Sequence, residues 1–113
     1  MTVVRRNART LIDSPAERVH TWLLAAMPGG ALTGLLATFE VGAAAGEFRQ
    51  HQGVEFVMVL AGQVTITFAD GATTVLDEGD SACFDAQKLH AYANTDDREL
   101  TLVSVAVDPR ARA

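Results

Sequence analysis

Two histidines and one glutamate are the side chains of this sequence best suited to chemistry. His51, Glu55 and His90 offer two imidazoles and one carboxylate, a donor set that non-haem iron proteins use and that manganese, nickel or zinc also accept. On a straight strand, residues 51 and 55 would lie roughly 13 Å apart, too far for one ion. A turn at Gln52-Gly53 would fold His51 back toward Glu55. The alternative is that each histidine is a packed, hydrogen-bonded side chain without a ligand role.

The segments that must position these residues have the pattern of short strands separated by turns. Residues 63–68 alternate apolar and polar side chains with the two-residue period of a strand. Asp70-Gly71 then supplies the residues that a tight hairpin needs. Apart from a brief helical turn near residues 14–19, no segment shows sustained helical periodicity. Strands are therefore expected at residues 22–27, 32–41, 55–61, 63–68, 73–76, 81–84, 91–93 and 100–107, which predicts a small all-β jelly roll or barrel.

The size and composition of the chain limit its function further. With 113 residues, of which 49% are hydrophobic and 20% charged, the chain is expected to form a single domain over residues 1–113. Its formal net charge of -5 argues against direct nucleic-acid binding, which needs a basic surface. Its single cysteine, Cys83, excludes an intramolecular disulfide and favours a cytoplasmic location. We expect that thiol to be a buried apolar group.

An uncharged stretch from residue 19 to residue 39 is long enough to span a bilayer. Pro28-Gly29-Gly30 divides it into two short apolar runs, however. Proline and glycine at this point predict a turn, and the two runs are therefore expected to form a buried hairpin. No export signal is expected either, because no continuous apolar run follows the N-terminal arginines. The sequence therefore predicts no membrane partner.

Two motifs in the chain resemble those of the cupin superfamily. The segments are GEFRQHQGVEFVMVLAG, with Gly46, His51, Glu55 and Gly62, and GDSACFDAQKLHAYAN, with Gly79, His90 and Asn94. The resemblance implies an all-β, RmlC-like cupin β-barrel, a double-stranded β-helix or jelly roll. Its core would cover about residues 32–107 behind an N-terminal arm at 1–20. Small cupins commonly form homodimers through N-terminal strands, and the apolar run at 22–27 fits such a surface.

One departure from the first motif bears on metal binding. The resemblance implies metal ligands at His51, Glu55 and His90, but Arg49 replaces the first histidine of the usual pair. If Arg49 points into the barrel, as its two-residue offset from His51 suggests, it should pair with Glu55. It would then repel a cation by about 4 kcal/mol or more. If Arg49 instead extends to solvent, three ligands remain for one iron, manganese, nickel or zinc ion. The expected cofactor is therefore either none or one divalent transition metal.

These residues support two main functional hypotheses. Tyr92 should share the face of His90, which gives a ligand-binding set of Arg49, His51, Glu55, His90 and Tyr92. The first hypothesis is a small-molecule-binding barrel in which Arg49 takes over the charge of the metal and, with His51 and His90, binds a small organic anion. The run Arg49-x-His51-x-Gly53-x-Glu55, with Phe84-Asp85 before His90, also resembles the C-terminal sensor domain of helix-turn-helix/cupin transcription regulators, which implies a sensor role. The second is a metal-dependent dioxygenase, isomerase, cyclase or lyase. A structural subunit with a filled barrel is the third reading. Ser81 and Ser104 lack the Asp–His partners of a hydrolase triad.

Overall fold

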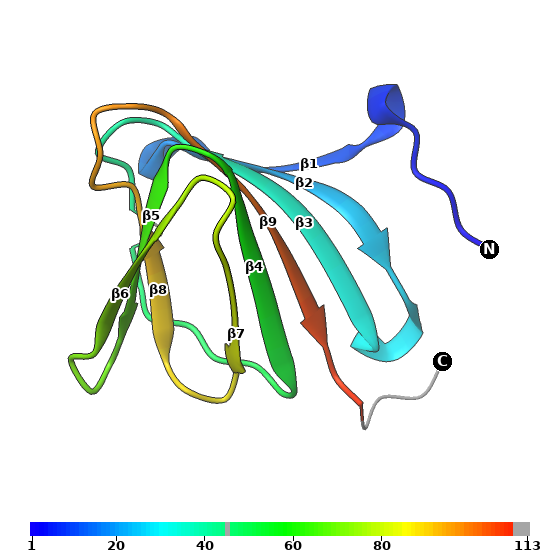
Figure 1. Cartoon of the computed structure of the whole chain (residues 1–113). Helices are drawn as coiled ribbons and strands as arrows, with labels where there is room; N and C mark the ends of the chain where they lie inside the picture. The colour runs from blue at the N-terminus through cyan, green and yellow to red at the C-terminus, as the bar shows by residue number, and fades with distance from the viewer. Residues whose placement is uncertain (45, 110–113) are drawn as a thin grey trace.

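The structure is a computed structural model that describes residues 1–44 and 46–109 (Figure 1). Nine strands and three short 3-10 turns make up the described chain. The turns are η1 (Arg6–Ala8), η2 (Pro15–Glu17) and η3 (Pro28–Gly30). The strands are β1 (Thr10–Ser14), β2 (Val19–Ala26), β3 (Leu32–Phe39), β4 (Val54–Ala61), β5 (Gln63–Phe68), β6 (Thr73–Asp77), β7 (Ser81–Asp85), β8 (His90–Ala93) and β9 (Leu100–Val107).

The strands form two antiparallel sheets that face each other as a jelly roll, which confirms the fold expected from the sequence. The larger sheet has the order β1-β2-β3-β9-β4-β7, and the smaller has the order β6-β5-β8. In Figure 1 the smaller sheet lies on the left and most of the larger sheet on the right. Alternate residues of each inner face fill the space between the sheets, as the strand period requires. The fully buried side chains include Val57, Val59, Val64, Ile66, Leu100 and Leu102.

Most strand limits agree with the sequence pattern to within one residue, but β2 begins three residues earlier than expected and β3 ends two residues earlier, at Phe39. Residues 63–68 and 100–107 form strands with the expected limits, and the divided apolar stretch forms the β2–β3 hairpin around η3. β1 was not expected from the sequence. It pairs with β2 at the edge of the larger sheet, and its Leu11 and Ile12 side chains are half exposed. A short edge strand without a buried face has no alternating apolar signal.

A loop spanning residues 46–53 is fastened to the segment that leads into β8. Arg49 and His90 exchange two main-chain hydrogen bonds, of 2.8 and 2.9 Å. The His51 N–H donates to the Ala86 carbonyl at 2.9 Å, and the Ala86 N–H donates to the Gly53 carbonyl at 3.0 Å. Gly53 has a φ of +89°, and a Cβ there would lie 2.0 Å from the Val107 carbonyl oxygen. Only glycine fits this bend, which returns the chain from His51 into β4.

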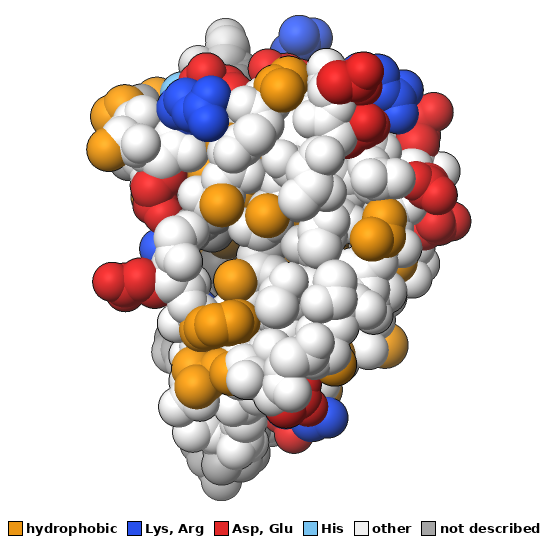
Figure 2. Space-filling view, turned by 90° about the vertical axis from the view of Figure 1, so that its left-hand side faces the viewer, with side chains coloured by type: hydrophobic (Ala, Val, Ile, Leu, Met, Phe, Trp, Pro, Cys, Tyr) orange, Lys and Arg blue, Asp and Glu red, His pale blue; other side chains and the backbone are white. Residues whose placement is uncertain are grey.

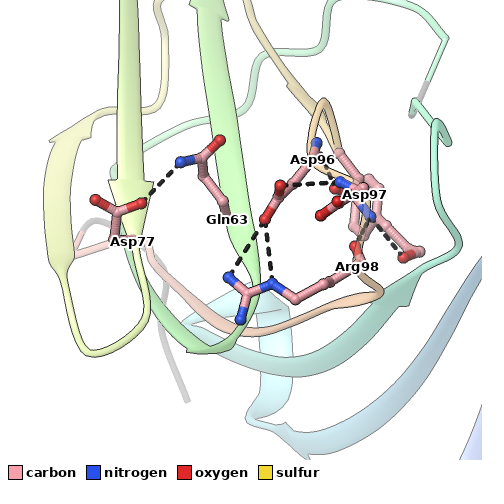
Figure 3. A network of polar contacts seen from close by, with 7 residues as sticks. Gln63, Asp77, Asp96, Asp97 and Arg98 are labelled. Carbon is pink, nitrogen blue, oxygen red and sulfur yellow. Dashed lines mark hydrogen bonds and ion pairs between the residues drawn. The ribbon is translucent and has the colours of Figure 1, made fainter.

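The opposite end of the barrel carries a network of solvated polar side chains (Figure 3). Gln63 donates to Asp77 at 2.8 Å, and the Arg98 guanidinium contacts Asp96 at 3.3 Å. Hydrogen bonds from the Asp97 N–H and then from the Arg98 side chain lower the pKa of the partly exposed Asp96 carboxyl. Figure 2, which views the smaller sheet, shows acidic side chains gathered in the upper half of this face. This end of the barrel is therefore acidic.

No helix in the described part of the chain has the length and apolar character needed to cross a membrane.

Candidate metal and ligand site

A cavity of about 480 Å³ opens at the end of the barrel where β4 and β8 begin. In Figure 1 this end faces downward. The lining comes from both sheets, from η3 and from the 46–53 loop. All five residues that the sequence predicted as a ligand-binding set line it, namely Arg49, His51, Glu55, His90 and Tyr92. The barrel is thus not filled by side chains at this end, which argues against a purely structural subunit.

Three candidate metal ligands converge at the base of this cavity. One donor atom from each of His51, Glu55 and His90 lies within 4.8 Å of the other two. His51 Nε2 is 2.8 Å from Glu55 Oε1, and His90 Nε2 is 3.7 Å from Glu55 Oε2. Glu55 and His90 are buried, whereas His51 is partly exposed. The bend at Gly53 folds His51 back toward Glu55, so the turn inferred from Gln52-Gly53 is confirmed.

Main-chain carbonyls fix how both imidazoles face the carboxylate. His90 Nδ1 lies 2.7 Å from the Lys88 carbonyl oxygen, and His51 Nδ1 lies 3.2 Å from the Gln52 carbonyl oxygen. Because a carbonyl oxygen only accepts, each Nδ1 must carry the proton. In their neutral forms, both rings therefore direct the lone pair of Nε2 at the carboxylate of Glu55. Two lone pairs and a negative charge aimed at one point are mutually repulsive unless a positive charge lies between them, and either a proton on Nε2 or a metal ion provides it.

The residues present fit a divalent transition metal. Two imidazole nitrogens and one carboxylate oxygen form a set that such metals accept. In the described chain, no lysine or arginine forms an ion pair with the Glu55 carboxylate, whose partners there are the two imidazoles and the Tyr92 hydroxyl. The Nδ1 contacts supply the outer hydrogen bonds that commonly orient histidine ligands. A metal on three protein ligands would keep coordination positions open toward the cavity.

Tyr92 belongs to the same cluster. β8 is a regular strand, so Tyr92 and His90 lie on the same inner face, as the two-residue offset predicted. The Tyr92 hydroxyl donates a hydrogen bond to Glu55 Oε2. Burial, and next the negative charge of Glu55, raise the pKa of Tyr92 far above its ordinary value. The hydroxyl therefore stays protonated and acts as a donor at every ordinary pH.

Arg49 lies at the cavity but does not pair with Glu55, so this part of the sequence expectation was wrong. Its side chain is exposed, although it contributes to the cavity lining. No ion pair or side-chain hydrogen bond joins Arg49 to any residue in the described ranges. The offset argument failed because residue 49 forms only an isolated bridge with His90, not a strand. The guanidinium is thus available at the rim, and the three candidate ligands remain intact.

Sequence reasoning also misjudged two smaller residues. Cys83 is exposed on β7, not buried, because the inward positions of that strand belong to Ala82 and Phe84. Ser104 was considered only for a hydrolase triad, yet it lines the cavity. Its alternation with the buried Leu100 and Leu102 could have placed it on the inner face of β9.

A two-sheet jelly roll with a His/Glu/His group inside defines a class of small β-barrels with a ligand site in the barrel. The family model for the cupin domain matches residues 35–106. The chain therefore belongs to the cupin family.

Solved structures show the same fold. The cupin domain of an XRE family transcriptional regulator from Enterobacter cloacae matches with a TM-score of 0.71 and 23% identity, over 82% of this chain and 99% of that one. An RmlC-like cupin from Shewanella frigidimarina NCIMB 400 matches with a TM-score of 0.78 and 18% identity, over 97% of this chain and 93% of that one. FeII HppE matches with a TM-score of 0.80 and 18% identity, over 94% of this chain but only 60% of that one. At these identities the likeness concerns the fold alone. No curated protein matches the chain.

Proposed function

We propose that this cupin binds a small organic anion in its barrel, at a divalent transition metal held by His51, Glu55 and His90. The observation that carries the proposal is the convergence of two Nε2 atoms on the buried Glu55 carboxylate, at the base of an open cavity. A bound metal would supply Lewis acidity and open coordination positions for an oxygen of the ligand. The metal could be iron, manganese, nickel or zinc.

Arg49 is the group that would favour an anion in this cavity. A guanidinium offers a fixed fork of donors to a carboxylate or phosphate. Arg49 stands at the rim without an ion-pair partner in the described chain. The remaining wall combines small or apolar residues with polar ones and with two carboxylates. The small or apolar residues are Gly29, Gly30, Leu35, Ala91 and Ala106, and the carboxylates belong to Glu47 and Asp108. The ligand would thus bind through its acidic group and bury its carbon skeleton against the wall.

Elemental analysis of purified protein and calorimetry with the metal-loaded protein test this proposal together. The protein should retain about one transition metal per chain after dialysis, and Arg49→Gln should weaken the binding of small carboxylates by roughly tenfold or more, since charged hydrogen bonds contribute about 1.5–3 kcal/mol. Metal content should not fall in this variant.

Arg98→Gln serves as the matched control, because Arg98 contacts Asp96 at the opposite end of the barrel. A protein without stoichiometric metal that still binds carboxylates would refute the metal part. Equal carboxylate affinities of wild type and Arg49→Gln would refute the role of Arg49.

The biological role that we propose first is sensing. The cupin domain of an XRE family transcriptional regulator has this fold, and a ligand-binding barrel without its own DNA contacts suits the acidic charge of this chain. A metal-dependent enzyme is the second candidate, because three protein ligands leave room for a reacting group. Incubating metal-loaded protein with candidate acids distinguishes the two: a sensor leaves their NMR spectra unchanged, whereas an enzyme converts them.

We also propose that the chain forms a homodimer through the outer face of the larger sheet. On β4, the side chains of Val54, Phe56 and Leu60 are 50%, 39% and 46% exposed. Apolar groups gathered on one outer face usually mark a contact surface.

The exposed thiol of Cys83 on the adjacent β7 suits a reducing cytoplasm.

Phe56→Glu should convert this dimer to a monomer, because the charge would have to be buried without a partner. Light scattering after size-exclusion chromatography measures the change in mass. Val75→Glu is the control, since Val75 is 49% exposed on the smaller sheet. A monomeric wild type, or a dimeric Phe56→Glu protein, would contradict the proposal.

A further inference from the structure

Ser104 places a hydroxyl group on the wall of the cavity. It lies on β9 among the inward positions, and its side chain is only 9% exposed. It is one of four buried polar residues among those described, and the cavity lining includes it. Of the other three, Glu55 and His90 belong to the metal-ligand group, and Asn94 is fully hydrogen-bonded at the opposite end.

The Ser104 hydroxyl has no hydrogen-bond partner among residues 1–44 and 46–109. Its direct neighbours explain this, because β9 pairs Ser104 with Leu35 on β3 and with Val57 on β4. Both side chains are aliphatic and offer neither donor nor acceptor. No described side chain has a buried polar atom without a hydrogen-bond partner, so the Ser104 oxygen must be accessible in the cavity that it lines. This hydroxyl therefore makes no hydrogen bond that stabilises the described barrel and is available to a ligand.

The position of Ser104 relative to Glu55 gives the size of a ligand that could reach both. Glu55 pairs directly with Ala106 across β4 and β9. Ser104 is therefore the diagonal neighbour of Glu55 on the same face, at about 7–8 Å. A molecule whose acidic group lies at His51, Glu55 and His90 would reach Ser104 with a group a few bonds further along its skeleton.

We infer that Ser104 is a specificity-determining residue that hydrogen-bonds a second polar group of the ligand, so that the site selects short-chain hydroxy- or oxo-carboxylic acids over plain carboxylic acids. This inference rests on the proposed binding of an organic anion at the metal. The serine hydroxyl suits both kinds of group, because it donates to a carbonyl and accepts from a hydroxyl. Its oxygen is accessible only from the cavity side, where the ligand would lie.

Calorimetry with butyrate and 4-hydroxybutyrate, on protein loaded with one equivalent of metal, tests the inference. Wild type should bind 4-hydroxybutyrate roughly 3- to 10-fold more tightly than butyrate, the range that one neutral hydrogen bond provides. Ser104→Ala should bind the two acids with equal affinity. Ser104→Thr keeps the hydroxyl and should restore the preference.

Thermal unfolding of the unliganded protein provides a second measurement. Because the hydroxyl makes no hydrogen bond within the described chain, Ser104→Ala should leave the Tm unchanged. A serine with a purely structural role would instead lower the Tm when replaced. Ser81→Ala, the same change at an exposed position of β7, should alter neither the Tm nor the preference.

The outcomes separate the two proposals. Binding of butyrate and 4-hydroxybutyrate with equal affinity to wild type, or a preference that survives in Ser104→Ala, would refute the role of Ser104 while the anion site stands. A clear loss of stability in Ser104→Ala would also refute it. If neither acid binds to metal-loaded wild type, the anion site itself is refuted, and the role of Ser104 with it.

Discussion

Replacing Glu55 with glutamine is expected to weaken transition-metal binding by about a hundredfold or more. Changes to groups that merely orient metal ligands already cost 10- to 100-fold in affinity, and here the sole carboxylate of the donor set would be lost. Glutamine keeps the shape of the side chain and leaves an acceptor for the Tyr92 hydroxyl. Competition against a chromogenic chelator measures the affinity directly.

Thermal unfolding gives an independent check on the same variant. Metal at a hundredfold its dissociation constant should stabilise wild type by about 2.7 kcal/mol, and this gain should be absent in Glu55→Gln. Glu47→Gln is the matched control, because Glu47 is an exposed cavity-lining residue outside the His51, Glu55 and His90 group. Unchanged metal affinity in Glu55→Gln would contradict the site.

Replacing Asn94 with alanine should reduce the free energy of unfolding by about 2–4 kcal/mol, because one buried and three part-buried hydrogen bonds to the main chain would be lost. Asn94 is 1% exposed. Its Nδ2 group donates to the carbonyls of Phe39, Glu40 and Arg98 at 3.1, 3.2 and 2.8 Å. Its Oδ1 atom accepts from the Asp96 N–H at 3.1 Å. One side chain thus joins the end of β3 to the loop that precedes β9.

Urea denaturation followed by circular dichroism measures this loss. Asn7→Ala is the control, because Asn7 lies exposed in η1. Metal and carboxylate binding by the folded fraction of Asn94→Ala should persist, since Asn94 lies outside the cavity lining. A stability loss below about 1 kcal/mol would show that water or a rearranged loop replaces these hydrogen bonds.

Much of the fold could be predicted because most of its strands have one buried face. Where apolar side chains alternate, as along β5 and β9, the expected limits agree with the structure. β1 escaped prediction because Leu11 and Ile12 lie half exposed at a sheet edge. Its existence depends on pairing with the following strand, β2, and this pairing is not visible in the side-chain pattern of residues 10–14 alone.

The candidate site was predictable in its residues but not in the direction of each side chain. Tyr92 lies where predicted because it shares a regular strand with His90. Arg49 does not, because the offset rule applies to strands and residue 49 belongs to a loop with one isolated bridge. The absence of a partner for Ser104 depends on its neighbours across two strands, Leu35 and Val57. No local reading of the sequence contains that information.

The 46–53 loop does not behave as a lid over the cavity. The reciprocal main-chain bonds between Arg49 and His90, with those that join His51 and Gly53 to Ala86, hold it in place before any ligand arrives. Ligand binding at this site therefore costs little backbone conformational entropy, because the loop is already ordered when the chain folds. Such preorganisation favours the binding of a small ligand, because the few contacts of a small ligand would not supply enough free energy to order a flexible loop.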